Sequence, residues 1–285
     1  MNQSPINYMG SKRRLMNQLL PLFPNNINTF YDLFAGSMTV SLNVEANHYL
    51  VNDLDSTLMD MFNDLTGLNN DEVVAIREDL NNFIDKQYYL KTRDIYNNFD
   101  NLEGSTIKSI ALYELITCSF NGLSRFNKKG EYNMPYSSKE RIGTKTFFDN
   151  KMKVLNNFIK VCKNRDIHFE SKSYSYFLEF AKHDDFIYLD PPYWNTSSTY
   201  NDGSRKLSWS NEDEQKLYQE LTKIQDKTRF ALSNVLIHRG QVNPYLTKFI
   251  KDNRLYVHHL NMSYSNSSYH TKNNDKSDEV LITNY

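Results

Sequence analysis

Short apolar segments typical of strands alternate with helical stretches in residues 1–55 and again in 151–285. Ser210, followed three residues later by Asp213, forms a capping box that begins a helix at 211–224. We expect the apolar segment 38–44 to start another helix. The strand-like segments are TFYDLF (29–34), HYLVNDLD (48–55), DIHFES (166–171), FIYLD (186–190), RFALSN (229–234), RLYVHHL (254–260) and EVLITN (279–284). This alternation predicts an α/β fold whose mostly parallel sheet is covered on both faces.

The middle of the chain has a different pattern. Residues 58–68 and 107–120 are helical in character, and a polar, aromatic segment, NGLSRFNKKGEYNMPYSSK, follows them. Because this stretch interrupts the alternation, we expect one domain to be formed by 1–55 and 151–285, with a second domain inserted at 56–150.

Charge and cysteine content limit the function classes. The net charge is −1, but residues 45–103 hold thirteen acids and four bases, whereas 121–165 hold eleven bases and three acids. The basic segment suits a polyanion, although solvated surfaces often carry such charge too. Cys118 and Cys162 are too few for a disulfide framework or a cysteine-based zinc site. Neither a signal segment nor an apolar run of about eighteen residues occurs, so we expect a soluble, cytoplasmic protein with no membrane partner.

The segment IYLDPPYWN ends an apolar run in an acid, two prolines and two aromatic residues. Proline cannot donate a ladder hydrogen bond, so the strand should end at Asp190. Each proline also restricts the residue before it, which leaves Asp190, Pro191, Pro192 and Tyr193 few backbone conformations. Ligands of open α/β sheets bind at the carboxyl ends of strands. The segment therefore predicts a stiff loop that presents an acid and a ring to a ligand, although a rigid turn without function is an alternative.

A second group of residues follows the first two predicted strands. The turn at Gly36 lies between Asp32 and Asp53, and an acid at the end of the second strand suits ribose hydroxyls. Because larger residues follow Gly36, a pyrophosphate would be poorly held, and a ligand with ribose but no phosphate, such as S-adenosylmethionine, fits better. A plain tight turn beside an exposed acid is the alternative. Lys12, next to a predicted turn at Gly10, either pairs with a carboxylate or lies in solvent.

Six motifs occur in the order NYMGSK, DLFAGS, VND, FNGLSRFNKKGEYNMPY, LDPPYW and LSN. In this order the chain resembles the Dam-type, alpha-group DNA adenine-N6 methyltransferases, from Asn7 to the last strand-like segment. LDPPYW is shared by several amino-methyltransferases, but its combination with FNGLSRFNKKGEYNMPY is highly specific. The resemblance implies a Rossmann-like, S-adenosyl-L-methionine-dependent methyltransferase fold. It also implies that 56–150 is a helical target-recognition domain with a β-hairpin.

The resemblance carries a mechanism and a donor site. Asp190 and the Pro191 carbonyl would accept the two N–H protons of an adenine amino group, and Tyr193 would stack on the base. The prolines, Pro192 included, hold these groups together, and the methyl group passes directly without a covalent intermediate. No metal is suggested. The expected donor-binding residues are Tyr8, Lys12, Asp32, Phe34, Gly36, Thr39, Asp53, Tyr174 and Asp190.

The implied partner is double-stranded DNA from which the target adenine is flipped out. Phe120 matches an intercalating aromatic, Asn121 stands beside it, and Asn7 replaces a lysine that reads guanine in many relatives. Met38 replaces the second glycine of the usual turn, as a bulky residue does in some phage-encoded members. Leu123, Arg125 and Pro135 match positions that read GATC. The expected phosphate contacts are Lys128, Lys129, Lys139 and Arg141.

Three alternatives stay open. The same chemistry on another short site would suit the modification half of a restriction-modification system, with a cognate endonuclease that acts separately. A second enzyme class would methylate RNA or a protein amide. The third is a catalytically weak, DNA-binding relative.

Overall fold

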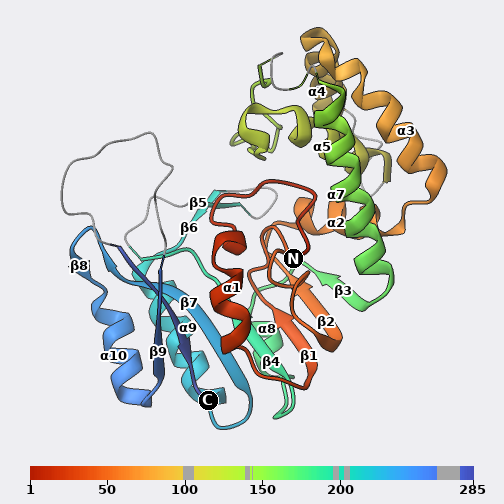
Figure 1. The fold of residues 1–285 in the computed structure, drawn as a ribbon. Coiled ribbons are helices and arrows are strands. Elements are labelled where there is room, and N and C mark those ends of the chain that lie inside the picture. Colours follow the sequence, from red (N-terminus) through yellow and green to blue (C-terminus); the bar gives the residue numbers. More distant parts are fainter. Residues whose placement is uncertain (99–105, 139–141, 143, 195–198, 202–205, 262–276) are drawn as a thin grey trace.

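The computed structural model describes residues 1–98, 106–138, 142, 144–194, 199–201, 206–261 and 277–285 (Figure 1). Two of the expected phosphate contacts, Lys139 and Arg141, lie outside this part of the chain. Its helices and strands are η1 (Lys12–Arg14), α1 (Met16–Leu19), η2 (Leu20–Leu22), β1 (Ile27–Asp32), β2 (Ala46–Asn52), α2 (Ser56–Gly67), α3 (Asn70–Leu80), η3 (Asn82–Ile84), α4 (Lys86–Asn98), α5 (Thr106–Cys118), η5 (Phe120–Gly122), α7 (Lys145–Lys163), β3 (Asp166–Glu170), α8 (Ser175–Leu178), β4 (Phe186–Leu189), β5 (Thr199–Asn201), β6 (Lys206–Ser208), α9 (Asn211–Ile224), β7 (Arg229–His238), β8 (Gln241–Val242), α10 (Pro244–Asn253), β9 (Tyr256–Leu260) and β10 (Asp278–Thr283).

The described strands form one large sheet in the order β3-β2-β1-β4-β7-β10-β9, with β8 paired to β7, and a small separate pair, β5-β6. Neighbours from β3 to β7 are parallel, and β10 is antiparallel to both β7 and β9. The predicted α/β class and mostly parallel sheet are confirmed. Because β1, β2 and β4 are parallel, their carboxyl ends lie at the same end of the sheet. Asp32 ends β1, and Asp53 and Asp190 directly follow β2 and β4.

Both faces of the sheet are covered, as the central strand β4 shows. Its four residues are all buried. Phe186 and Tyr188 belong to one apolar cluster, and Ile187 and Leu189 belong to the other, as expected for side chains that alternate between two faces. The second cluster contains α9 and α10 residues, and the predicted capping box at Ser210 begins α9.

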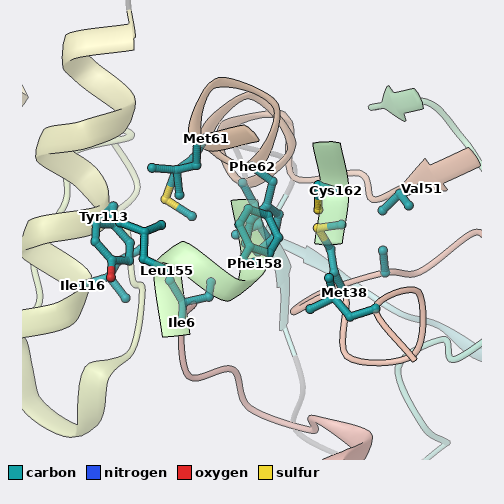
Figure 2. Packing of buried hydrophobic residues seen from close by; sticks show 14 of the residues in the cluster. Ile6, Met38, Val51, Met61, Phe62, Tyr113, Ile116, Leu155, Phe158 and Cys162 are labelled. Atoms are coloured by element: carbon teal, nitrogen blue, oxygen red, sulfur yellow. The ribbon is translucent and has the colours of Figure 1, made fainter. Parts of the chain in front are cut away.

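The apolar cluster on the first face continues into the helices of the middle segment (Figure 2). The rings of Phe62 on α2 and Phe158 on α7 have centroids 5.7 Å apart, and Tyr113 on α5 is in the same cluster. In Figure 1, α3, α4 and α5 stand to one side of the sheet, and α10 lies at the other end. Because α7 is continuous from Lys145 to Lys163, it crosses the boundary expected at residue 150. The middle segment and the sheet thus share packing, and the division into domains stays a prediction.

Two local expectations differ from the structure. Residues 38–44 form successive turns instead of a helix, although Leu42 N–H donates to the Met38 carbonyl at 2.9 Å. The side chain of Asn43 donates to the Thr39 carbonyl at 2.8 Å, and such local side-chain bonds compete with regular helix. The hairpin expected in the insertion is present as antiparallel bridges, Ser119 with Tyr136 and Phe126 with Tyr132, and not as named strands.

No helix in the described ranges is long and apolar enough to cross a bilayer.

Candidate active site

The loop after β4 places its acid between groups from distant parts of the chain. Lys12, in η1, lies with Nζ 2.8 Å from Asp190 Oδ2 and 3.4 Å from Glu279 Oε1 on β10. The Tyr193 hydroxyl donates to Glu279 Oε1 at 2.8 Å, and Lys12 Nζ lies 4.9 Å from the centroid of the Tyr193 ring. Lys12 is only 6% exposed, so it is a buried ion-pair partner and not a solvated lysine. We call Lys12, Asp190, Tyr193 and Glu279 the ion cluster.

Burial and charge shift the titration of this cluster. Burial raises the pKa of Asp190, the ammonium of Lys12 opposes this rise, and Glu279 adds to it, with a net increase. Burial alone would lower the pKa of Lys12, but the carboxylates of Asp190 and Glu279 outweigh burial and raise it. Burial and both carboxylates also hold the pKa of Tyr193 well above its ordinary value, so Tyr193 stays a neutral donor.

A second acid stands beside this cluster. Asp32 is 1% exposed, and its Oδ2 accepts from Ser41 Oγ at 2.5 Å. Burial, with smaller contributions from Asp190 and Asp53, raises the pKa of Asp32 to about 7, although the Ser41 hydrogen bond opposes this. Its other oxygen, Oδ1, is buried and has no hydrogen-bond partner among the described residues. Buried polar atoms are normally paired, so this oxygen is suited to a ligand that carries positive charge.

The turn after β1 is tightly packed. The Gly36 N–H donates to Asp53 Oδ2 at 2.8 Å, which joins the ends of β1 and β2. Gly36 has φ +46°, and an added Cβ would lie 2.8 Å from Cε1 of Tyr8. Position 36 therefore requires glycine both for its backbone conformation and for the ring above it. Asp53 and Asp190 both contribute to the raised pKa of Tyr8, after burial, so Tyr8 lies near the same acids.

The remaining expected donor residues lie around this turn. Thr39 Oγ1 is 2.8 Å from Ser37 Oγ and 3.0 Å from Ser11 Oγ. The ring of Phe34 stacks on that of Tyr174 with centroids 5.4 Å apart. Trp209 meets the Phe34 ring edge-on at 5.8 Å, and its indole nitrogen has no hydrogen-bond partner in the described part of the chain.

Most of the described residues that are expected to contact DNA lie on the segment that folds back between Cys118 and Ser137, which we call the fold-back segment. Phe120, the first residue of η5, is 54% exposed. Its backbone N–H donates to the Pro135 carbonyl at 2.8 Å, so these two residues are neighbours although they are fifteen positions apart in sequence. Pro135 is exposed and Leu123 is half-buried.

Two polar residues of this region are held by the protein itself. Asn7 Nδ2 donates to the Asn121 carbonyl at 3.0 Å, which ties the N-terminal segment to η5. Arg125 Nε donates to Asn133 Oδ1 at 2.8 Å, and its Nη2 donates to the Asn133 carbonyl at 3.0 Å. The guanidinium is therefore oriented before any ligand binds. Lys128 and Lys129 are exposed in the turn that contains Gly130.

These features match a family in sequence. A sequence model of the D12 class N6 adenine-specific DNA methyltransferases matches residues 8–271. The chain belongs to this family. The predicted Dam-type resemblance and the Rossmann-like methyltransferase fold are thereby confirmed.

The curated proteins that resemble the chain include modification methylases. It is 38% identical over 290 residues to "Modification methylase StsI" of Streptococcus sanguinis and 38% identical over 288 residues to "Type II methyltransferase M.FokI" of Planomicrobium okeanokoites. Each alignment covers 99% of this chain and 43% of the relative. The chain thus spans less than half the length of these two methyltransferases. "DNA adenine methylase" of Haemophilus influenzae is 28% identical over 193 residues, with 66% of this chain and 63% of that protein covered.

Methyltransferases in general use S-adenosylmethionine, and the residues of this chain fit that donor. The donor carries a sulfonium and an ammonium group, both cationic, and the acids Asp190 and Asp53 lie near enough to Asp32 to raise its pKa. The unpaired Asp32 Oδ1 offers a buried acceptor. The rings of Phe34 and Tyr174 offer apolar surface to a purine.

Sequence reasoning missed two residues of this candidate site, Glu279 and Trp209. Glu279 lies in the last strand and outside every motif used for the resemblance, so only the antiparallel pairing of β10 with β7 brings it to Tyr193. Trp209 directly precedes the capping box of α9. An acid or tryptophan at a strand end is a weak signal by itself. No group of three or more His, Cys, Asp or Glu side chains in the described ranges is arranged to hold a metal.

Proposed function

We propose that this chain transfers a methyl group from S-adenosylmethionine to N6 of an adenine flipped out of double-stranded DNA. The observation that carries the proposal is the Asp190-Pro191-Pro192-Tyr193 loop, which follows the central strand β4 and is bound to Lys12 and Glu279. Bound S-adenosylmethionine would supply an electrophilic methyl group on a positively charged sulfur.

The loop suits the acceptor chemistry of an exocyclic amine. The lone pair of adenine N6 is delocalised into the ring, so the nitrogen is a poor nucleophile. The Asp190 carboxylate and the Pro191 carbonyl would accept its two N–H protons and so direct the lone pair out of the ring plane. Because Lys12 contacts Oδ2 of Asp190 at 2.8 Å, the carboxylate is fixed before substrate binds, which favours a preorganised site.

The donor would be held by the residues around the β1 turn. Asp53, the Gly36 turn and Tyr8 lie together and would bind the ribose part, whereas Asp32 Oδ1 would accept from a cationic group of the donor. Lys12 and Thr39 would support this donor site through their contacts with Asp190 and Ser37. The rings of Phe34 and Tyr174, joined by Trp209, would hold the donor adenine.

The fold-back segment would engage the duplex. Phe120, which is exposed and begins η5, would fill the space of the extruded base, with Asn121 beside it. Arg125 would read guanine, while Leu123 and Pro135 would meet bases of the same site, and we propose that this site is GATC. Lys128 and Lys129 would contact phosphates, as would Lys139 and Arg141. Asn7 is engaged by Asn121, so discrimination at the first base should be weaker than at the others.

The similarity to the methylases of Streptococcus sanguinis and Planomicrobium okeanokoites supports a role in DNA modification, with a cognate endonuclease that acts separately. The test is transfer of tritiated methyl from S-adenosylmethionine to duplex DNA and to RNA of the same sequence. We expect label in DNA alone, at N6 of adenine. Label in RNA, or none in either, would contradict the function. Duplexes with each single substitution in GATC test the site, and equal kcat/KM on all of them would refute GATC while leaving the chemistry intact.

A further inference from the structure

Glu279 is a buried acid that reaches the site from the opposite direction to the family motifs. It lies on β10, which enters the sheet antiparallel between β7 and β9. The register of β10 against β7 shifts between Asp278 and Glu279. A register shift of this kind interrupts the regular alternation of side chains along the strand. The Glu279 side chain is 10% exposed and points at Lys12 and Tyr193. The neighbouring Asp278 instead contacts His259, with Oδ1 3.0 Å from Nδ1.

Glu279 has two partners that matter for the reaction. The same oxygen, Oε1, accepts from the Tyr193 hydroxyl at 2.8 Å and lies 3.4 Å from Lys12 Nζ. The first contact fixes the ring that would stack on the target adenine. The second divides the cation of Lys12 between two carboxylates, so that Asp190 is paired but not fully neutralised.

We propose that Glu279 is a positioning residue for methyl transfer: it anchors Tyr193 and shares Lys12, and so keeps the Asp190 carboxylate available to the adenine amino group. The inference rests on the proposed function. Glu279 acts through Tyr193 and Lys12 and is not itself placed against the base. Without its charge, Lys12 would pair with Asp190 alone, and the carboxylate would become a weaker acceptor.

This role differs from a merely structural one in a way that can be measured. The charge of Glu279 contributes to the raised pKa of Asp190, and so its removal should shift the acid limb of the rate profile to lower pH. The charged and titratable groups near Asp190 come from six elements or loops: Lys12, Glu279, Tyr193, Tyr188, Tyr8 and Asp32. Only Glu279 is changed in the test, so the direction of the shift is assigned to it.

The experiment compares Glu279→Gln, which keeps size and an acceptor but removes the charge, with Glu279→Ala and with Asp278→Asn as the matched control on the same strand. Single-turnover transfer to duplex DNA should fall about tenfold in Glu279→Gln and about a hundredfold in Glu279→Ala, because the ring is also released. The Kd for S-adenosylmethionine, by calorimetry, should stay within about threefold. Asp278→Asn should match the wild type.

A double variant tests the contact between Glu279 and Tyr193. Combining Glu279→Ala with Tyr193→Phe should reduce the rate by less than the product of the two single losses, because both changes remove the same hydrogen bond.

A readout that needs no methyl transfer separates this inference from the proposed function. The Lys12 ammonium should give an exchange-protected NMR signal, identified by its loss in Lys12→Arg, that changes in both Glu279 variants and not in Asp278→Asn. If the wild type methylates DNA, rates within about twofold of wild type in both variants would overturn the inference. So would equal losses of donor affinity and rate with an unmoved pH profile. If the wild type does not methylate DNA, the proposed function fails, and an unchanged Lys12 signal would overturn the placement of Glu279 as well. Should Glu279→Ala not fold, Glu279→Gln alone decides.

Discussion

The ion cluster and the fold-back segment are built in opposite ways. Lys12, Asp190 and Glu279 come from η1, the loop after β4 and β10, and their side chains are 7%, 17% and 10% exposed. The fold-back segment lies within one stretch of chain, and it displays Phe120 and Arg125 to solvent. Two of its exposed residues are held by near neighbours in sequence: Arg125 by Asn133, and Lys129, whose N–H donates to Asn127 Oδ1. The segment as a whole is also tied to α4, where the Tyr89 hydroxyl donates to the Met134 carbonyl at 2.9 Å.

This difference suits the two tasks. A buried charge must be paired, so each member of the ion cluster depends on the others, and the cluster should tolerate little change. Exposed side chains such as Phe120 and Arg125 can vary in what they recognise without disturbing the core. Changes in the ion cluster should therefore reduce turnover on every sequence, whereas changes in the fold-back segment should alter which sequence is used.

The largest effect should follow the loss of the acid itself. Asp190→Ala should reduce methyl transfer by more than about a thousandfold, because the main acceptor for the adenine amino group is removed. It also leaves Lys12 with one carboxylate, so a loss of stability of about 3–5 kcal/mol is expected and is checked by urea unfolding. Single-turnover kinetics measure the rate, and calorimetry should show a donor Kd changed only a few-fold.

Asp184→Ala, at an acid that is 86% exposed, is the control and should leave the rate unchanged. Asp190→Asn preserves the shape if the alanine variant is unstable. Residual activity within about tenfold of wild type in both Asp190 variants would remove Asp190 from the mechanism.

The sequence predicts part of the sheet and of the ion cluster, but not the whole of either. The end of β4 at Leu189 follows from the backbone chemistry of Pro191 and Pro192, and the alternation of strands predicts the parallel part of the sheet. The antiparallel entry of β10 is a matter of tertiary packing, which local patterns do not encode. Glu279 was therefore missed. For Lys12 the sequence left two alternatives open, and only the structure shows which carboxylates surround it.

The next largest effect should come from substitutions that alter base recognition. Arg125→Ala should cost about 1–3 kcal/mol in kcat/KM at one guanine and should relax specificity there, with turnover on other substitutions unaffected. Asn133→Ala should have a smaller effect at the same base, because it frees the guanidinium that Asn133 now orients. A panel of singly substituted duplexes measures both. An equal loss on every duplex would mean that Arg125 contacts a phosphate, and the proposed contrast between the regions would then be wrong.

Donor affinity should depend on pH through Asp32. Its pKa is raised to about 7, so the carboxyl is largely neutral below this pH and ionised above it. A cationic donor prefers the ionised form, so affinity should rise about tenfold between about pH 6 and pH 8 and then level off. Calorimetry at these pH values measures the change. The Asp32→Asn variant should bind S-adenosylmethionine more weakly, and its affinity should not change with pH. The same slope in this variant would assign the titration to another group, of which Asp190 is the nearest candidate.

The smallest effect concerns the junction between the two regions, where Asn7 binds Asn121. Gly122 and Gly130 both have left-handed backbone, with φ +65° and +79°, so alanine at either position should cost about 1–2 kcal/mol of strain. A Cβ at Gly122 would also lie 2.7 Å from Asn7 Nδ2, whereas one at Gly130 would meet nothing within 4 Å.

Gly122→Ala should thus displace Asn7 and reduce extrusion of a 2-aminopurine base, measured by its fluorescence, while Gly130→Ala should not. Adding Asn7→Ala to Gly122→Ala should recover part of the lost stability, because the clash is then absent. If both glycine variants behave alike, the Asn7 contact does not join the two regions, and the fold-back segment would act independently of the N-terminal segment.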